Sequence, residues 1–321
     1  MNRVVITGAG IYSSIGKNLD EVKDSLWNGR SGIVIDDERK KIGYQSALTG
    51  KLETPDLKGI LDHRARACMP QQAAFAYLAT AEALKTAAIT PEYLEQNSAG
   101  ILYGSDSSAL PVIEAVDIIR ETGDTGMLSS GSLFQSMNSI VTMNLSVIFR
   151  LNGINFTVSG ACASGAHAIG MGFLMIRHGY QNIIICGGSQ EVNLYCVGNF
   201  DALGAFSKLE SEPEKACRPF DRKRDGLVPS GGAATVVLEE MGQALRRGAP
   251  IIGEIIGYGF SSDGSHVSVP EVKGQVRAIN MALSEAGINP RQVDYINAHA
   301  CLLYTSPSPR DRTRSRMPSS A

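Results

Sequence analysis

Short apolar runs alternate along this chain with longer stretches in which apolar residues recur at helical spacing. The short runs predict buried strands at 4–7, 98–104, 154–158, 182–187, 232–238, 251–258 and 293–297. The longer stretches predict helices over 20–27, 71–88, 131–150, 164–178, 242–247 and 272–286. Because strands and helices alternate, we expect a layered α/β fold.

A cluster of glycines follows the first predicted strand, in the stretch 7–16. Glycines in this position can hold a dinucleotide pyrophosphate, but the pattern needs a third glycine where Ser13 stands. None of the ten tyrosines has a lysine four residues later, so a short-chain dehydrogenase is also excluded. We therefore interpret the cluster as a structural turn.

The composition is that of an ordinary globular protein, with 43% hydrophobic and 19% charged residues. A net charge of −2 gives no reason to expect nucleic acid as a partner. No apolar run is long enough to span a membrane, and no secretion leader is visible, so we expect no membrane association. The six cysteines lack zinc-site spacing and suit a reducing compartment, which predicts a cytoplasmic protein.

One cysteine, Cys162, stands in a frame of very small residues between a predicted strand and a predicted helix. The free backbone N–H groups and the positive dipole end at a helix start favour a thiolate there. The small neighbours leave space for a substrate carbonyl to approach. Most free cysteines are small buried hydrophobes, but this setting favours a nucleophile for covalent acyl transfer.

The sequence around Cys162, Gly-Ala-Cys-Ala-Ser-Gly-Ala-His-Ala-Ile-Gly, closely resembles the active-site motif of β-ketoacyl-[acyl-carrier-protein] synthases. The opening residues 3–11 resemble the first strand and turn of that family. Residues 218–226 and 231–239 resemble its middle signature and the strand after it, and 294–299 the segment with its first catalytic histidine. The ordered motifs extend over residues 1–299, which makes the resemblance specific.

The resemblance implies a thiolase-like fold of five αβαβα layers, built from two similar halves. The expected domains are an N-terminal ketosynthase half at 1–250 and an incomplete C-terminal half at 251–299.

The resemblance also implies decarboxylative condensation of an acyl thioester with malonyl-carrier, in fatty-acid or polyketide synthesis. Cys162 would take the acyl group, and its backbone N–H would supply one oxyanion donor. His299, for which the residues alone leave a catalytic role and a packing role equally open, would stabilise the malonyl enolate. His167, five residues after Cys162, points elsewhere on the helix and is expected to be a packing residue.

The same resemblance implies partners. An acidic acyl carrier protein would dock on basic residues, with Arg64, Arg66 and Arg120 as candidates. A second copy of the chain would pair through 129–150 and 154–158. No cofactor is expected, because phosphopantetheine arrives on the carrier.

Two other functions remain open at this stage. One is a thiolase-like acyltransferase that uses coenzyme A esters, and the other is a non-catalytic ketosynthase-like fragment or partner subunit. Residues 300–321 are rich in Ser, Pro and Arg and interrupt the histidine motif, so we expect a non-native disordered tail. On that interpretation the chain is truncated and inactive in condensation.

Overall fold

The computed structural model describes residues 1–266 and 270–299. Their contacts form two compact units. The first unit contains Met1–Arg30, Lys51–Cys196 and Ser230–Ile255. The second contains Ser31–Gly50, Val197–Pro229 and the described residues from 256 onward. The predicted tail at 300–321 lies outside the described residues.

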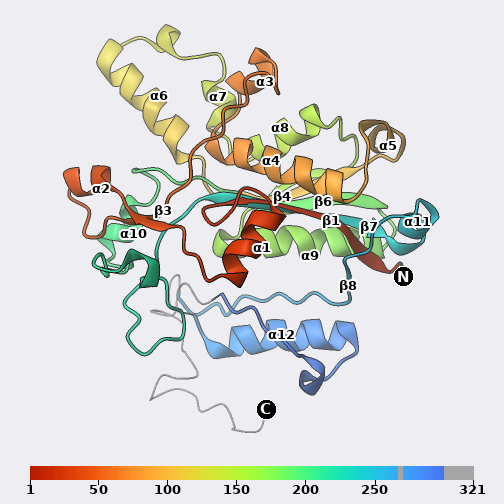
Figure 1. Cartoon of the computed structure of the whole chain (residues 1–321). Coiled ribbons are helices and arrows are strands. Elements are labelled where there is room, and N and C mark those ends of the chain that lie inside the picture. The colour runs from red at the N-terminus through yellow and green to blue at the C-terminus, as the bar shows by residue number, and fades with distance from the viewer. Residues whose placement is uncertain (267–269, 300–321) are drawn as a thin grey trace. The chain divides into compact units, whose positions relative to one another are not determined.

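A six-stranded mixed sheet forms the centre of the first unit (Figure 1). Its strands, in spatial order, are β5 (Asn155–Val158), β4 (Gly100–Gly104), β6 (Ile183–Gln190), β7 (Gly232–Glu240), β1 (Val4–Ser13) and β8 (Gly253–Ile255). The β5, β4 and β6 strands are parallel, whereas β7 is antiparallel to both of its neighbours. The parallel strands therefore end at one edge, where α/β folds place their functional groups.

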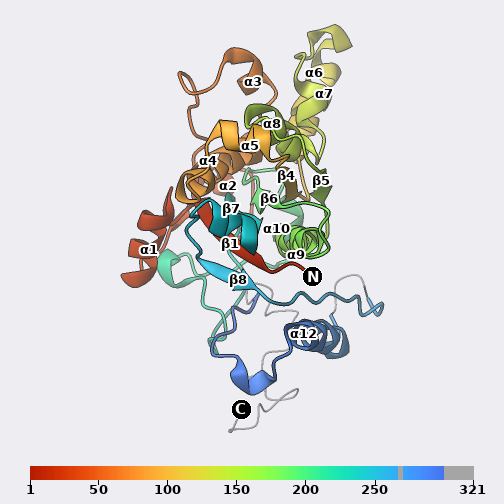
Figure 2. The ribbon, with the colours of Figure 1, turned by 90° about the vertical axis from the view of Figure 1, so that its right-hand side faces the viewer.

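Helices cover both faces of this sheet (Figure 2). One face carries α4 (Gln71–Thr86) and α8 (Ile140–Ile148), and the other carries α9 (Ser164–Arg177). The buried residues of β1, β4, β6, α4 and α8 form one hydrophobic core. The remaining helices of the unit are α1 (Leu19–Trp27), α3 (His63–Ala67), α5 (Pro91–Gln96), α6 (Ala109–Thr122), α7 (Ser132–Gln135) and α11 (Met241–Arg246), with 3-10 turns at Thr125–Met127 and Ala161–Ala163.

The glycine cluster after the first strand is not the turn that the sequence predicts. Gly8 and Gly10 lie inside β1, which continues to Ser13. A Cβ on Gly10 would stand 2.1 Å from the carbonyl oxygen of Ala79 in α4, and one on Gly8 would stand 2.2 Å from that of Ala83. The glycines are needed because strand and helix touch backbone to backbone.

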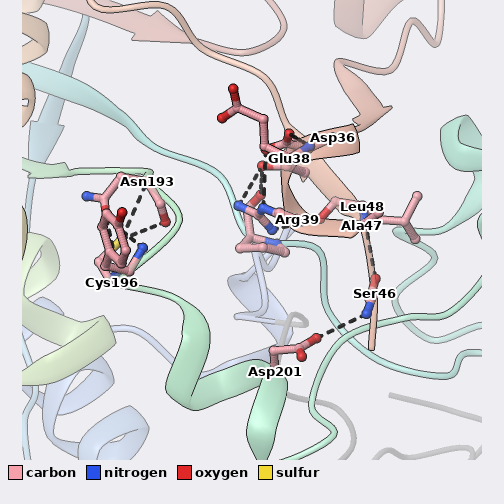
Figure 3. Close-up of polar contacts among 12 residues, drawn as sticks. Asp36, Glu38, Arg39, Ser46, Ala47, Leu48, Asn193, Cys196 and Asp201 are labelled. Atoms are coloured by element: carbon pink, nitrogen blue, oxygen red, sulfur yellow. Dashed lines mark hydrogen bonds and ion pairs between the residues drawn. The ribbon is translucent and has the colours of Figure 1, made fainter. Parts of the chain in front are cut away.

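The second unit contains a small hairpin-like pair, β2 (Ile33–Ile35) and β3 (Leu48–Gly50), joined by α2 (Asp37–Lys41). Arg39 is fully buried there and donates to the Leu48 carbonyl at 3.1 Å, while Asp201 accepts from the backbone N–H of Ser46, also at 3.1 Å (Figure 3). The unit also contains α10 (Gly198–Ala202), α12 (Val272–Ala286) and 3-10 turns at Pro213–Lys215 and Pro290–Gln292.

The close backbone packing of glycines on a helix in the first unit has a counterpart in the second, where the glycines lie in an extended segment after β8 and not in a strand. A Cβ on Gly257 would stand 2.3 Å from the Ala282 carbonyl oxygen of α12, and one on Gly259 would stand 1.9 Å from that of Ala278. In both units two glycines separated by one residue meet alanines four residues apart. This repeated packing agrees with the expected similarity of the two halves.

Three predicted elements differ in the structure. The helix expected over 131–150 is divided into α7 and α8, and the strand expected over 251–258 pairs only at Gly253–Ile255. Residues 293–297 form no strand. An apolar-polar alternation gives a segment a strand-like pattern, but a strand also needs a neighbour for its backbone hydrogen bonds, and this segment pairs with none of the described residues. Among the described residues, no helix is long and apolar enough to cross a membrane.

Candidate active site

A pocket of about 420 Å³ opens at the edge where the parallel strands end. It lies within the first unit, and its wall comes from the ends of β1, β4 and β6, the start of β7 and the turn before α9. Among its lining residues are Tyr12, Gly104, Asp106, Cys162, Gln190 and Gly231. The structure therefore places Cys162, the nucleophile predicted from the sequence, in a pocket at the sheet edge where functional groups are expected.

Cys162 occupies the 3-10 turn Ala161–Ala163, which leads directly into α9. Its side chain is exposed. The Ser164 hydroxyl closes this turn, since its oxygen accepts from the Gly160 N–H at 2.8 Å and donates to the Ala161 carbonyl at 2.6 Å. The backbone N–H of Cys162 has no acceptor among residues 1–266 and 270–299, which leaves it available to a substrate oxygen.

Small residues bring α9 unusually close to the sheet. A Cβ on Gly104 would stand 2.5 Å from the Gly165 nitrogen, and one on Gly188 would stand 3.2 Å from the Gly165 Cα. Larger side chains at these positions would force the helix away and close the pocket beside Cys162. The frame of tiny residues thus has a steric function as well as providing space for a carbonyl.

The other cysteine near this sheet is built differently. Cys186 is fully buried in β6, and burial raises the pKa of its thiol. A thiol held in its protonated form is a poor nucleophile. Exposure therefore distinguishes Cys162 from Cys186 as the candidate for covalent chemistry.

Tyr103 is the β4 residue directly before the lining residue Gly104. Its ring is fully buried, and its hydroxyl is 3.0 Å from the Thr235 hydroxyl and 3.3 Å from the Ala234 carbonyl. Burial raises the pKa of Tyr103, so the hydroxyl stays protonated and can donate to these partners. This network links β4 to β7 across the intervening strand β6.

The other predicted site residues fall in different places. His299 is exposed and belongs to the second unit, whereas Cys162 belongs to the first. His167 is half-buried on α9 beside Gly160. Arg64 and Arg66 lie on α3, and Arg120 lies on α6, on the same side of the sheet as α4 (Figure 2).

Two carboxylates beside the pocket were not predicted from the sequence. Asp106 follows β4 and lines the pocket, and Glu191 follows β6 and is almost completely buried. Glu191 accepts from the Ser107 hydroxyl and the Ala109 N–H, both at 2.6 Å, and so holds the start of α6. Acidic residues directly after two parallel strands were the available signal.

Two family models match this chain. The model described as beta-ketoacyl synthase, N-terminal domain, matches residues 1–244. The model described as beta-ketoacyl synthase, C-terminal domain, matches residues 252–301.

Curated proteins and solved structures give the same result. The chain is 38% identical over 303 residues to 3-oxoacyl-[acyl-carrier-protein] synthase 1 of Escherichia coli K12, covering 93% of this chain and 73% of that protein. It matches a beta-ketoacyl synthase structure from Burkholderia phymatum with a TM-score of 0.86 and 34% identity, over 94% of this chain and 74% of that one. It also matches a complex of a type II polyketide-synthase acyl carrier protein with its ketosynthase bound to a hexaketide, with a TM-score of 0.82 and 27% identity, over 94% of this chain and 73% of that one. These matches confirm the predicted thiolase-like α/β fold.

Proposed function

Because the chain belongs to the β-ketoacyl synthase family and is an acyltransferase of the 3-oxoacyl-[acyl-carrier-protein] synthase type, we propose that Cys162 is its acylated nucleophile. The observation that carries this proposal is the exposed thiol of Cys162 at the start of α9, in the pocket at the sheet edge. The family match supports this function over the thiolase-like alternative, and competition between carrier and coenzyme A esters tests the choice. The retained thiol argues against a non-catalytic partner subunit.

The reaction proposed for a complete synthase of this family has two stages, and the first of them acylates Cys162. In the first, the Cys162 thiolate attacks the carbonyl of an acyl-carrier thioester, a new thioester forms on Cys162, and the carrier leaves as its free thiol. In the second, malonyl-carrier loses CO₂, and the electron pair of the broken C–C bond forms an enolate. The enolate carbon attacks the acyl carbonyl, and the Cys162 thiolate leaves as the 3-oxoacyl-carrier forms.

Two groups of this chain stabilise the charges that develop. The N–H of Cys162, for which the described part of the chain offers no acceptor, donates to the oxyanion of each tetrahedral intermediate. His299 donates to the malonyl thioester oxygen and so stabilises the enolate, a role supported by its place in the motif of residues 294–299. No metal or nucleotide takes part, because the pantetheine arm arrives with the carrier. The five cysteines that the structure describes are free thiols, which suits a reducing cytoplasm.

The acyl donor of this chain is an acyl carrier protein. Support comes from the matched structure of a ketosynthase with its carrier protein and from the exposed Arg120 side chain on α6. Arg64 lies in α3, whose first turn is capped by Asp62. Basic residues at such positions would attract the acidic carrier and increase its association rate.

The carrier preference is tested by comparing two acyl donors. We expect acyl-carrier to acylate Cys162 at least about tenfold faster than the same acyl group on coenzyme A, when both are at equal low concentration. Replacing Arg64 and Arg120 together by glutamate should raise the half-saturating concentration of acyl-carrier and flatten its salt dependence, because rim charges act on encounter. Transfer from the coenzyme A ester should stay the same in this variant. Equal rates with both donors would contradict the carrier assignment. The amount of acyl group on the peptide that contains Cys162 is measured over time by peptide mapping with mass spectrometry.

The chain also forms a homodimer through β5 and the neighbouring α7–α8 segment. Strand β5 is an edge strand, paired on one side with β4. Large apolar side chains are exposed around it, including Phe156 at 54% and Val147 at 77%. An exposed edge strand with such neighbours is normally covered by a partner.

Charged substitutions in this surface are expected to separate the dimer. Phe156→Lys combined with Val147→Asp would place two charges in a desolvated interface, which proteins strongly disfavour. Sedimentation at micromolar concentration should show a dimer for the unchanged chain and a monomer for the double variant. Trp27→Lys, at an apolar residue of α1 that is 87% exposed, is the matched control and should remain dimeric. An unchanged chain that sediments as a monomer would rule out this interface.

A further inference from the structure

Asp106 connects strand β4 to the turn that carries Cys162. One carboxylate oxygen, Oδ1, accepts from the hydroxyl of Ser159 and from the backbone N–H of Ala161, the latter at 3.3 Å. Ala161 stands directly before Cys162 in the chain, and Ser159 stands three residues before it. The ladder between β4 and β5 is extended by a bond from the Ser105 N–H to the Val158 carbonyl at 3.2 Å, which brings Asp106 opposite this turn.

The turn that Asp106 holds has an unfavourable backbone conformation. Ala161 has a φ of +50°, in the left-handed region, although it carries a Cβ. Such a conformation costs about 1–2 kcal/mol for a non-glycine residue. It persists only where the surroundings fix it. Here the Ala161 N–H is held by Asp106 and its carbonyl by the Ser164 hydroxyl.

The backbone of Asp106 is itself fixed by its surroundings. The side-chain amide of Asn138 donates to its backbone carbonyl at 3.4 Å, and β4 before it is completely buried. A carboxylate anchored on a rigid strand is suited to fixing a neighbouring turn, because little of its own freedom is lost when it accepts these bonds.

We propose that Asp106 is a positioning residue, whose carboxylate fixes the Ser159–Ala161 turn and thereby the direction in which the Cys162 thiol enters the pocket. This inference rests on the proposed role of Cys162. Without Asp106 the turn loses its tie to β4 and keeps the Ser164 hydrogen bonds and the bond from the Ala163 N–H to the Gly160 carbonyl, so the thiol spends less time aligned with the acyl carbonyl. A displacement of about 1 Å from the reactive geometry can reduce a rate about 10²-fold, while binding of the carrier at other surfaces is unaffected.

Single-turnover acylation of Cys162 by acyl-carrier separates this role from a general structural one. Asp106→Ala should lower the acylation rate constant by about 10–100-fold and leave the half-saturating carrier concentration within about twofold. Asp106→Asn keeps an acceptor oxygen for both donors and should restore most of the rate. Ser159→Ala removes one of the two hydrogen bonds and should give an intermediate rate. Asp56→Ala removes a carboxylate that accepts from the Lys58 N–H on another loop and should match the unchanged chain.

Alkylation of Cys162 by iodoacetamide, together with the thermal unfolding midpoint, makes the outcomes distinct. We expect a changed alkylation rate in Asp106→Ala with little change in the midpoint. Unchanged acylation in Asp106→Ala would overturn the proposal, and so would an Asp106→Asn variant as slow as Asp106→Ala, since the charge would then be the relevant property. If Asp106→Ala does not fold, Ser159→Ala and Asp106→Asn carry the test. Absence of acyl-Cys162 in the unchanged chain would instead refute the proposed nucleophile, and alkylation would still report on Asp106.

Discussion

Replacing Cys162 by alanine should abolish covalent acylation of the chain by acyl-carrier. The pocket at the sheet edge contains this exposed thiol at the start of α9, and without it the acyl carbonyl has no nucleophile to attack. Loss of an enzyme's nucleophile typically lowers turnover by more than about 10³-fold. Cys162→Ser, with a hydroxyl that is a much weaker nucleophile, should retain only a trace of acylation. Intact-mass measurement after incubation with acyl-carrier gives the result directly.

Cys217 provides the matched control for this experiment, because its side chain is also exposed. It belongs to the second unit and is not among the residues that line the pocket. Cys217→Ala should be acylated like the unchanged chain. Acyl mass that persists undiminished in Cys162→Ala would show that a different residue is the nucleophile.

Replacing Arg247 by alanine should cost about 3–5 kcal/mol of unfolding free energy. The carboxylate of Glu239 is completely buried, and the guanidinium of Arg247 binds both of its oxygens, with the Nε–Oε2 bond at 2.9 Å. Arg247 also donates to the Ala87 carbonyl at 2.8 Å, and its guanidinium stacks over Tyr93. Its removal leaves a buried carboxylate with the Thr7 hydroxyl as its remaining side-chain partner. Urea unfolding followed by circular dichroism measures the change.

The adjacent residue Arg246 tests whether burial is the cause. Its side chain is 74% exposed, and its nearest contact with Glu240 is 3.9 Å long. Exposed pairs of this kind contribute about 0–1 kcal/mol, so Arg246→Ala should be nearly neutral. Replacing Glu239 and Arg247 together by methionine should recover much of the loss, because no buried charge remains. A cost below about 1 kcal/mol for Arg247→Ala would contradict this account.

The parts of the fold that the sequence predicts well are those with an unambiguous pattern. The alanine-rich stretch 71–88 becomes α4 with two residues fewer at its end. The isoleucine run at 182–187 becomes β6, but the strand continues beyond the predicted end through Gly188 and Ser189 to Gln190. Glycine and serine carry little strand preference of their own, and pairing with β7 extends the strand. Residues 293–297 show the reverse case, because their strand pattern finds no pairing partner among residues 1–266 and 270–299.

The candidate site could be predicted in part for similar reasons. Cys162 was identifiable because its local frame of small residues is itself informative. Asp106 was not, because its importance comes from a turn on a different strand, and one exposed aspartate looks like any other in a sequence. Gly8 and Gly10 were misinterpreted because a glycine pair has the same letters in a turn and in a strand that touches a helix.

The position of β1 inside the sheet has a consequence for how this protein is made. Strand β1, Val4–Ser13, leaves the ribosome before the other described strands and pairs along its whole length with β7, which ends at Glu240. At about 5–20 residues per second, the partner of β1 is synthesised roughly 10–45 s later. During that interval α4 is available, and its alanines offer Gly8 and Gly10 a close-fitting surface. Strand β1 can therefore pack against α4 of its own chain before β7 is synthesised, instead of associating with another nascent chain. Its backbone edge stays unpaired during this time and remains accessible to a chaperone.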